Sequence, residues 1–209
     1  MILWGYWRSS ATWRVRIGLH TKGVAYDHRH VDLRGGAQHG EAHRARNPMG
    51  QVPVLEVGGE RLTQSLAILR WLDATHPEPP LLPGDPMAAA RAWEIAEIVN
   101  AGVQPLQNLA VIGALQGAGL DGRAWARQRI AIGFAALEGL LGRVAGRHAV
   151  GDAVSIADLC LVPQVYNARR FGVALEPYPE LCRIERAASA LPAFVAAHPD
   201  NHRPPEVPS

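Results

Sequence analysis

This 209-residue sequence has little cysteine, no long apolar run and no strong excess of charge. Its two cysteines, Cys160 and Cys182, are too few for a disulfide framework or a four-cysteine metal site, and we predict that both fill space in a core. Glycine or a charged residue interrupts each apolar stretch well before the roughly 20 residues that span a bilayer. The sequence therefore predicts neither a disulfide-stapled protein nor a membrane protein.

The net charge, the histidines and the N-terminus each predict the absence of one kind of site or signal. A formal net charge of +2 is too mild to predict nucleic-acid binding. The nine histidines are scattered; His28 and His30 would share one face of a strand, but nothing nearby completes a metal-ligand set. The first six residues lack the basic and apolar regions of a signal peptide, so we expect a cytoplasmic protein without a metal site.

Hydrophobic residues make up 48% of the chain, ample material for a core. Up to about residue 75 the pattern mixes strands and helices, with a glycine stop at Gly23 and a hairpin signal at Gly58-Gly59. We predict strands at residues 1–6, 25–31, 52–57 and 61–63, and helices at residues 12–22 and 66–72. This order is that of a thioredoxin-like half.

A proline-rich break follows, at residues 76–80 and 83–86, and acts as a stiff connector. Helical patterns fill the rest, at residues 87–100, 125–144 and 191–197, with a capping-box start at Ser155-Ile156-Ala157-Asp158. The tail, residues 203–208, is expected to be extended or disordered. The predicted fold is thus an α/β thioredoxin-like domain at residues 1–80 followed by an all-α domain at residues 87–209.

Three short segments of the first domain could bind a ligand. In Gln51-Val52-Pro53, a cis bond would turn the backbone of Val52 toward a peptide-like ligand. Only about 5–6% of X–Pro bonds are cis, so the local sequence alone favours an ordinary edge-strand proline. In Gln64-Ser65, Ser65 is a good N-cap for the next helix, whose first N–H groups form an anion site. Plain capping accounts for Ser65 equally well.

The third segment is the turn that contains Ser9 and Ser10, between the first strand and the first helix. Two hydroxyls beside a helix N-terminus would push a bound thiol, with its ordinary pKa near 8.5, toward thiolate. Capping by Ser10 or Thr12 is the alternative explanation.

These segments together resemble the zeta class of glutathione transferases, which includes maleylacetoacetate and maleylpyruvate isomerases. The resemblance covers nearly the whole chain, and the later motifs are particular to that class. It rests on residues 8–17 (RSSATWRVRI), 47–53 (NPMGQVP), 64–68 (QSLAI), 104–109 (QPLQNL), 158–165 (DLCLVPQV) and 167–171 (NARRF).

The resemblance implies a glutathione cofactor and a specific set of residues that bind it. Ser9 and Ser10 would contact the sulfur, and Val52, ahead of a cis-Pro53, would pair with the cysteinyl backbone. Gln64 and Ser65 would hold the γ-glutamyl end, and Gln38 would reach the glycyl end. The implied set is Ser9, Ser10, Gln38, Val52, Pro53, Gln64, Ser65, Gln104 and Asn108.

Gln104 and Asn108 would approach the ligand from the helical domain, either of the same chain or of a partner subunit, since the family implies a homodimer. The resemblance further implies that Arg8 and Arg170 clamp the carboxylates of a small dicarboxylate substrate, a task suited to guanidinium groups. With Ser9 and Ser10 they form the expected catalytic set.

One departure from the family pattern is Ala11, which stands where many zeta enzymes have cysteine after two serines. It removes a protein cysteine as nucleophile and leaves maleylpyruvate isomerase as a close rival to maleylacetoacetate isomerase. The expected function is glutathione-dependent cis–trans isomerisation in aromatic catabolism. Two alternatives stay open: glutathione transfer to, or dehalogenation of, small α-halo acids, and a non-catalytic thioredoxin-like binding module.

Overall fold

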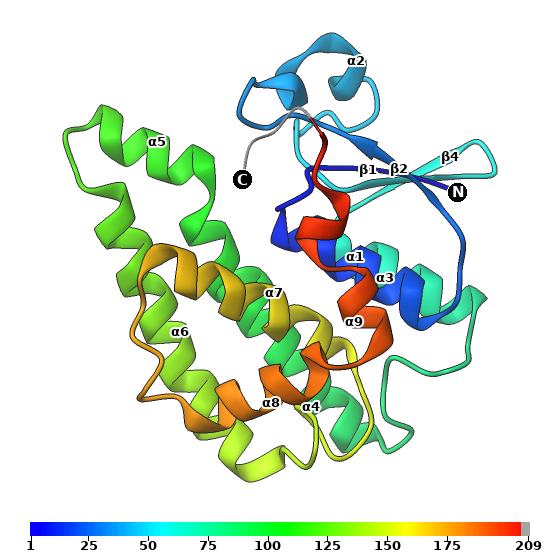
Figure 1. Cartoon of the computed structure of the whole chain (residues 1–209), viewed down its shortest axis with the longest axis vertical. Helices are drawn as coiled ribbons and strands as arrows, with labels where there is room; N and C mark the ends of the chain where they lie inside the picture. The colour runs from blue at the N-terminus through cyan, green and yellow to red at the C-terminus, as the bar shows by residue number, and fades with distance from the viewer. Residues whose placement is uncertain (206–209) are drawn as a thin grey trace. The chain divides into compact units, whose positions relative to one another are not determined.

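The computed structural model describes residues 1–205, which form two compact units (Figure 1). The N-terminal unit contains Met1–Pro80 and the segment that begins at Leu191. The helical unit is Leu81–Ala190. The sequence predicts one helical domain at residues 87–209, whereas the described residues from Leu191 onward cluster with the N-terminal unit.

A four-stranded mixed sheet is the centre of the N-terminal unit. The strands lie in the order β2-β1-β3-β4; β1 is parallel to β2 and antiparallel to β3, and β3 is antiparallel to β4. They are β1 (Ile2–Gly5), β2 (Asp27–His30), β3 (Val54–Val57) and β4 (Glu60–Thr63). This sheet, with its helices, confirms the predicted thioredoxin-like order.

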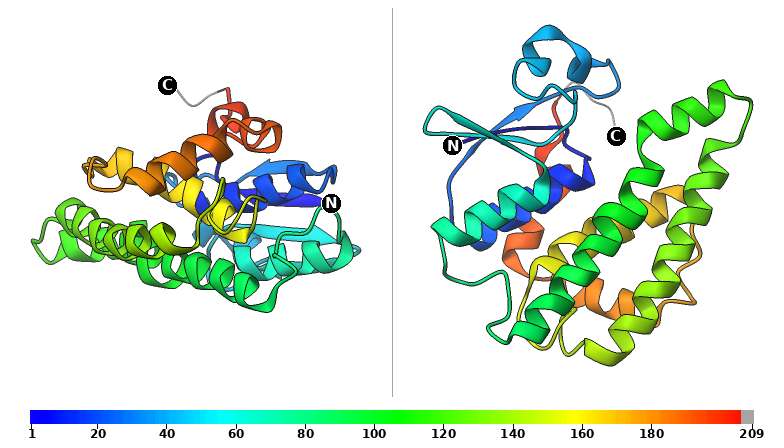
Figure 2. Two further views of the ribbon diagram at one scale, coloured as in Figure 1. Left: turned by 90° about the horizontal axis from the view of Figure 1, so that it is seen from below. Right: turned by 180° about the vertical axis from the view of Figure 1, so that it is seen from behind.

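Helices α1 (Ser10–Thr21) and α3 (Ser65–Thr75) lie side by side on one face of the sheet (Figure 2). Their apolar residues pack against the inward residues of β1 and β3, because alternate residues of a strand point to the same face. The buried cluster consists of Leu3, Val15, Leu19, Leu55, Ile68 and Leu72. It fixes where the ends of β1 and β4 meet the two helices.

Three glycines shape these connections. Gly58 and Gly59 both have positive φ, 57° and 86°, as a tight hairpin turn between β3 and β4 requires. A Cβ on Gly5 would collide with the Thr12 side chain, so glycine lets the end of β1 approach the first turn of α1.

The segment between β2 and β3 contains a short 3₁₀ helix, η1 (Ala37–His39), and a short helix, α2 (Glu41–Arg44). The segment after Leu191 contains α9 (Pro192–Ala196) and η4 (Pro199–His202), and α9 packs against α1. Arg203 and Pro204 belong to no helix or strand, in line with the expected extended tail, whereas residues 206–208 of that prediction lie outside the described residues.

The helical unit is built around α7 (Ile156–Phe171), which packs against α4, α6 and α8. Residues 156–165 of α7 are buried without interruption, Cys160 among them, as predicted. Cys182, in contrast, is only partly buried. The remaining helices of the unit are α4 (Pro86–Glu97), η2 (Ile98–Val103), η3 (Gln104–Gln107), α5 (Leu109–Gly117), α6 (Gly122–Val144) and α8 (Pro179–Ser189).

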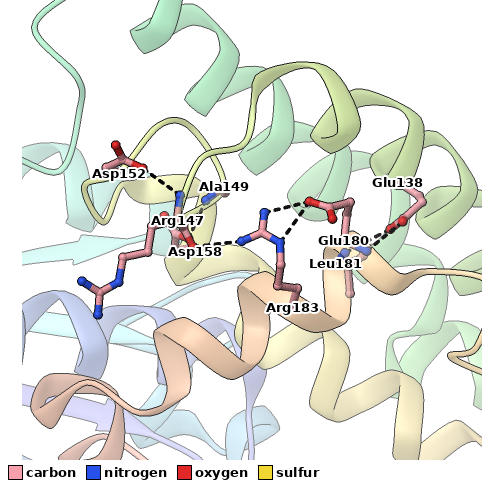
Figure 3. Close-up of polar contacts among 8 residues, drawn as sticks. All are labelled: Glu138, Arg147, Ala149, Asp152, Asp158, Glu180, Leu181 and Arg183. Carbon is pink, nitrogen blue, oxygen red and sulfur yellow. Dashed lines mark hydrogen bonds and ion pairs between the residues drawn. The ribbon is translucent and has the colours of Figure 1, made fainter.

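Polar contacts fix the starts of α7 and α8, and Figure 3 shows two sets of them, between Asp158 and Ala149 and from Glu138 to Glu180 and Leu181. The predicted capping box is confirmed: Asp158 accepts hydrogen bonds from the Ser155 N–H at 2.9 Å and the Ser155 hydroxyl at 3.2 Å, and also from the Ala149 N–H at 2.9 Å. Glu138 of α6 accepts from the first N–H groups of α8. Loop and helix starts in this unit are therefore tied together by buried or half-buried carboxylates.

One helical run of the described chain, Pro86–Gly117, is long and apolar enough to cross a membrane on length and composition alone. It exceeds the apolar stretches expected from sequence because it joins α4 to α5 through η2 and η3. Asn108, with extended backbone at φ −66° and ψ 149°, interrupts it, so the run is not one regular α-helix.

Candidate functional site

The turn between β1 and α1 presents Ser9 and Ser10. Ser9, not Ser10 or Thr12, is the N-cap of α1, and its Oγ accepts a hydrogen bond from the Thr12 N–H at 3.2 Å. A serine hydroxyl that accepts a bond still has its own O–H to donate. Ser9 can therefore cap the helix and polarise a ligand sulfur at once, so capping and thiol activation do not exclude one another. Ser10, the first residue of α1, is buried, and Ala11 follows half-buried.

Arg8 precedes this turn and lies against the indole of Trp7, with its guanidinium carbon 5.0 Å from the ring centre. The Nε of Arg8 is buried and has no hydrogen-bond acceptor among residues 1–205. Arg8 directly precedes Ser9 in the sequence. Its positive charge is free to pair with an anionic ligand.

The loop before β3 leads to Val52 and Pro53, which are joined by a cis peptide bond, the isomer implied by the family resemblance. Val52 lies two residues before β3, outside the paired register of β1 and β3. His43 and Asn47, both buried, bind the preceding carbonyl, that of Gln51, at 2.9 Å each. These contacts hold the loop that carries Val52.

Gln38 lies against the same loop. Gly50 has a φ of 62°, and a Cβ there would come within 3.0 Å of the Gln38 carbonyl oxygen. The side-chain Oε1 of Gln38 is buried without a donor among the described residues. Gln38 therefore offers an unused acceptor near the backbone that leads to Val52.

The turn between β4 and α3 contains the one non-glycine residue with positive φ in the described chain, Gln64, at φ 67° and ψ 113°. Gln64, not Ser65, occupies the N-cap position of α3, so the expectation that Ser65 is the cap is wrong by one residue. The Gln64 side chain is exposed, bonds no backbone group of its own helix, and has a weak contact with the Met49 sulfur at 3.7 Å. Strained residues of this kind cluster at ligand sites.

Ser65 is the first residue of α3 and is buried. Its Oγ accepts a hydrogen bond at 3.3 Å from Arg14, a fully buried residue of α1. The start of α3 is thus fastened to α1 and leaves its first N–H groups for an anion such as a carboxylate.

The N-terminal unit therefore contains eight of the residues expected to contact glutathione or substrate, on the three loops at one end of its strands and helices. They are Arg8, Ser9, Ser10, Gln38, Val52, Pro53, Gln64 and Ser65.

The other three expected residues belong to the helical unit. Gln104 begins η3, and Asn108 caps α5 by accepting from the Ala110 N–H at 3.2 Å. Arg170 is exposed near the end of α7, and its guanidinium donates to Asn167 at 3.3 Å. Their contacts with a ligand stay a prediction.

Two buried arginines of α1 were not expected to matter. Arg14 reaches Ser65, and Arg16 donates to the carbonyls of Trp7 at 2.8 Å and Ala197 at 3.1 Å. Burial lowers the pKa of Arg16 to about 10. The sequence signal was available but ambiguous: residues 12–19 alternate apolar side chains with arginine, and every one of them is buried.

A group of histidines surrounds this buried charge. The ring of His202, on η4, packs 5.3 Å from that of His28 and 6.4 Å from that of His20. Burial, and secondarily the charge of Arg16, lowers the pKa of His28 to about 3 and that of His202 to about 4. These rings are therefore neutral packing elements at physiological pH; no group of three or more His, Cys, Asp or Glu residues within residues 1–205 has a metal-binding arrangement.

Comparison with known proteins gives consistent results. Residues 1–74 match the family model "Glutathione S-transferase, N-terminal domain". The chain is 48% identical over 212 residues to "Probable maleylacetoacetate isomerase 2" of Drosophila melanogaster, covering 100% of this chain and 92% of the relative. It is 46% identical to the maleylacetoacetate isomerase of Rattus norvegicus, covering 100% and 95%.

Solved structures agree over both units. A maleylacetoacetate isomerase of Anaeromyxobacter dehalogenans with bound glutathione in its active site is 53% identical, with a TM-score of 0.89 over 99% of this chain and 97% of that one. A holo maleyl pyruvate isomerase, described as a bacterial glutathione transferase in the zeta class, is 38% identical, with a TM-score of 0.94 over 99% of each chain.

Proposed function

The chain belongs to the zeta-class glutathione transferases, and from this membership we propose that it is a glutathione-dependent cis–trans isomerase of a small dicarboxylic keto acid, maleylacetoacetate or maleylpyruvate. The observation that carries the proposal is the Ser9 hydroxyl, which caps α1 and keeps an O–H for the glutathione sulfur.

Ionisation of the thiol is the first task. The Ser9 hydroxyl and the positive end of the α1 dipole both favour a thiolate over a thiol, which lowers the pKa of the bound sulfur. Ser10, buried at the first position of α1, is assigned a supporting role. The nucleophile belongs to glutathione, so Ala11 in place of a cysteine does not obstruct the reaction.

Glutathione itself is held by backbone and amide groups. We assign its cysteinyl backbone to Val52, ahead of Pro53. Its γ-glutamyl carboxylate is assigned to the N-terminus of α3, with Gln64 and Ser65. Gln38 takes the glycyl end, and Gln104 and Asn108 add polar contacts from the helical unit.

The isomerisation needs no net oxidation or reduction. The thiolate adds to the cis double bond that is conjugated to a carbonyl, forming a C–S bond while the electron pair moves to the carbonyl oxygen as an enolate. The former double bond is now single and rotates. The enolate then collapses, the C–S bond breaks, and glutathione thiolate leaves the trans product. Arg8 and Arg170 are assigned to the substrate carboxylates and to the developing negative charge.

Three finer assignments belong to the same proposal. The enzyme works as a homodimer, resides in the cytoplasm and serves aromatic catabolism. These follow from the family expectation, and size-exclusion chromatography with light scattering tests the first of them.

The test of activity mixes the protein with glutathione and maleylpyruvate or maleylacetoacetate and follows loss of the cis-diacid absorbance. We expect a rate that requires glutathione and leaves glutathione unconsumed. No glutathione-dependent rate with either substrate would overturn the proposal. Release of chloride from a chloroacid with a stable glutathione adduct would instead favour the dehalogenase alternative. Absence of glutathione binding by calorimetry would favour a non-catalytic module.

A further inference from the structure

Three guanidinium groups gather around Trp7, the residue that precedes Arg8 and the Ser9 turn. Arg8 and Arg203 lie against its indole, with guanidinium carbons 5.0 Å and 4.8 Å from the ring centre. Arg16 binds its carbonyl at 2.8 Å. Arg203 comes from the other end of the chain, since the segment after Leu191 packs in the N-terminal unit.

The positive charge of this group is poorly balanced. Within residues 1–205, Asp200 is the one carboxylate in ion-pair range of any of the three arginines, at 3.6 Å from Arg203. That distance is too long for a hydrogen bond. Arg16 is enclosed by carbonyls and cannot reach solvent, whereas 28% of the Arg203 side chain remains exposed.

Donor groups are also in surplus here. Four buried N–H groups have no acceptor among the described residues: those of Trp7 Nε1, Arg8 Nε, Arg16 Nη1 and Arg203 Nε. Buried donors without acceptors are uncommon in folded proteins and each costs free energy. An excess of cationic donors beside one aromatic ring is suited to an anion with several oxygen atoms.

We propose that Arg203 is a further carboxylate-binding residue of the glutathione site, in addition to Arg8 and Arg170, which acts with Arg8 beside Trp7 to recognise a ligand that has two carboxylates. The inference rests on the proposed function for the identity of that ligand, a dicarboxylate joined to or lying beside the glutathione sulfur. Contact with the Trp7 ring restricts both guanidinium groups, so less rotamer entropy is lost when each binds a carboxylate.

This assignment gives the C-terminal segment a functional role. Arg16 fastens the segment at Ala197 to the same Trp7 carbonyl that precedes Arg8 and Ser9. One buried side chain therefore links the segment that carries Arg203 to the turn that contains Ser9. Arg203 determines specificity for charge on the substrate and takes no part in ionising the sulfur.

The test compares two glutathione derivatives by calorimetry on the full chain: dicarboxyethyl glutathione, which has two added carboxylates, and S-ethylglutathione, which has none. We expect the wild-type protein to prefer the first. Arg203→Gln should lower that preference about tenfold, the size expected for one charge-assisted contact, with the Kd of S-ethylglutathione changed less than about twofold. Arg203→Lys should be intermediate, because an ammonium keeps the charge but not the planar stack.

Arg29→Gln is the matched control, since Arg29 is an exposed arginine of the same unit whose one ion pair among residues 1–205 is with Asp27. It should behave as wild type. Three results would overturn the proposal: no preference in the wild type, an unchanged preference in Arg203→Gln, or an equal loss for both ligands. The last would mean that Arg203 only anchors the C-terminal segment.

Failure of this proposal is distinguishable from failure of the proposed function, because the binding ratio needs no turnover. Suppose that the wild type isomerises neither substrate but prefers dicarboxyethyl glutathione, and that Arg203→Gln loses this preference. The isomerase assignment alone would then fail. An active enzyme with an unchanged ratio would sink only the role of Arg203.

Discussion

Gln64 combines backbone strain with a side chain that does almost nothing for the fold, so replacing it should separate stability from binding. At φ 67° and ψ 113° it lies in a region that disfavours any residue with a Cβ, at a cost of about 1–3 kcal/mol. Glycine removes this cost but adds about 0.5–1 kcal/mol of backbone entropy on folding. Gln64→Gly should therefore stabilise the protein by about 1 kcal/mol, a rise in Tm of roughly 2–4 °C for a chain of this size.

The same change should weaken glutathione binding. Losing one amide hydrogen bond costs about 0.5–1.5 kcal/mol, which corresponds to a roughly three- to tenfold higher Kd. The assays are thermal or urea unfolding of the free protein, and calorimetric titration with glutathione. Gln64→Ala is the control: it removes the amide and keeps the strain, so it should lose affinity without gaining stability.

Two outcomes would refute this reasoning about Gln64. If Gln64→Gly is less stable than Gln64→Ala, the positive φ is not a source of strain. If both variants bind glutathione as tightly as the wild type, the amide of Gln64 does not contact the ligand, and the unusual backbone has some other cause.

Three further predictions follow from single contacts. Asp158→Ala should cost about 3–5 kcal/mol of unfolding free energy in urea, because the buried carboxylate accepts from the Ser155 N–H and hydroxyl; a cost near zero would contradict that role. Ser9→Asp keeps a helix cap but offers no hydroxyl proton and repels a thiolate, so the pKa of bound glutathione, followed by thiolate absorbance, should rise; an unchanged pKa argues against the hydroxyl. Burial lowers the pKa of His28 and His202 below 6.5, so their neutral forms stabilise the fold above pH 6.5 and that stability is lost as pH falls. His28 should account for about 2 kcal/mol of the unfolding free energy lost between pH 7.5 and 5. His28→Gln should flatten the plot of unfolding free energy against pH.

The order of elements in the N-terminal unit could be predicted from sequence because local patterns encode it. Short apolar strands, the Gly58-Gly59 turn and the leucine spacing after Ser65 each act within a few residues. The helices that the sequence patterns did not predict fall into two groups, one with readable signals and one without. The α8 helix was missed although Pro179 at its first turn and the spacing of buried Leu181 and Ile184 are readable signals. The short η1 and α2 have too few residues to show a period.

Boundaries at the site were less accessible to sequence reasoning. Ser9, Ser10 and Thr12 can each cap a helix, and either Gln64 or Ser65 can begin α3. Which residue caps depends on where the sheet ends, since the close approach of Gly5 to Thr12 fixes the first turn of α1. A one-residue shift at each turn changes which residue caps the helix, and the contacts of these residues with a ligand stay a prediction.

The contacts that hold the turn containing Ser9 are even harder to predict from local sequence patterns. Arginine is usually a surface residue, yet Arg16 is buried: it donates to two carbonyls, those of Trp7 and Ala197, and its Nη1 has no acceptor among the described residues. One of those partners lies 181 residues along the chain, so no window on the sequence contains the pair. A buried guanidinium without a carboxylate is costly unless the geometry around it is fixed. That requirement implies that loss of the C-terminal segment would take the Ala197 carbonyl from Arg16, leave it bound to the Trp7 carbonyl, and disturb the turn that contains Ser9, even though no residue after Leu191 was expected at the site.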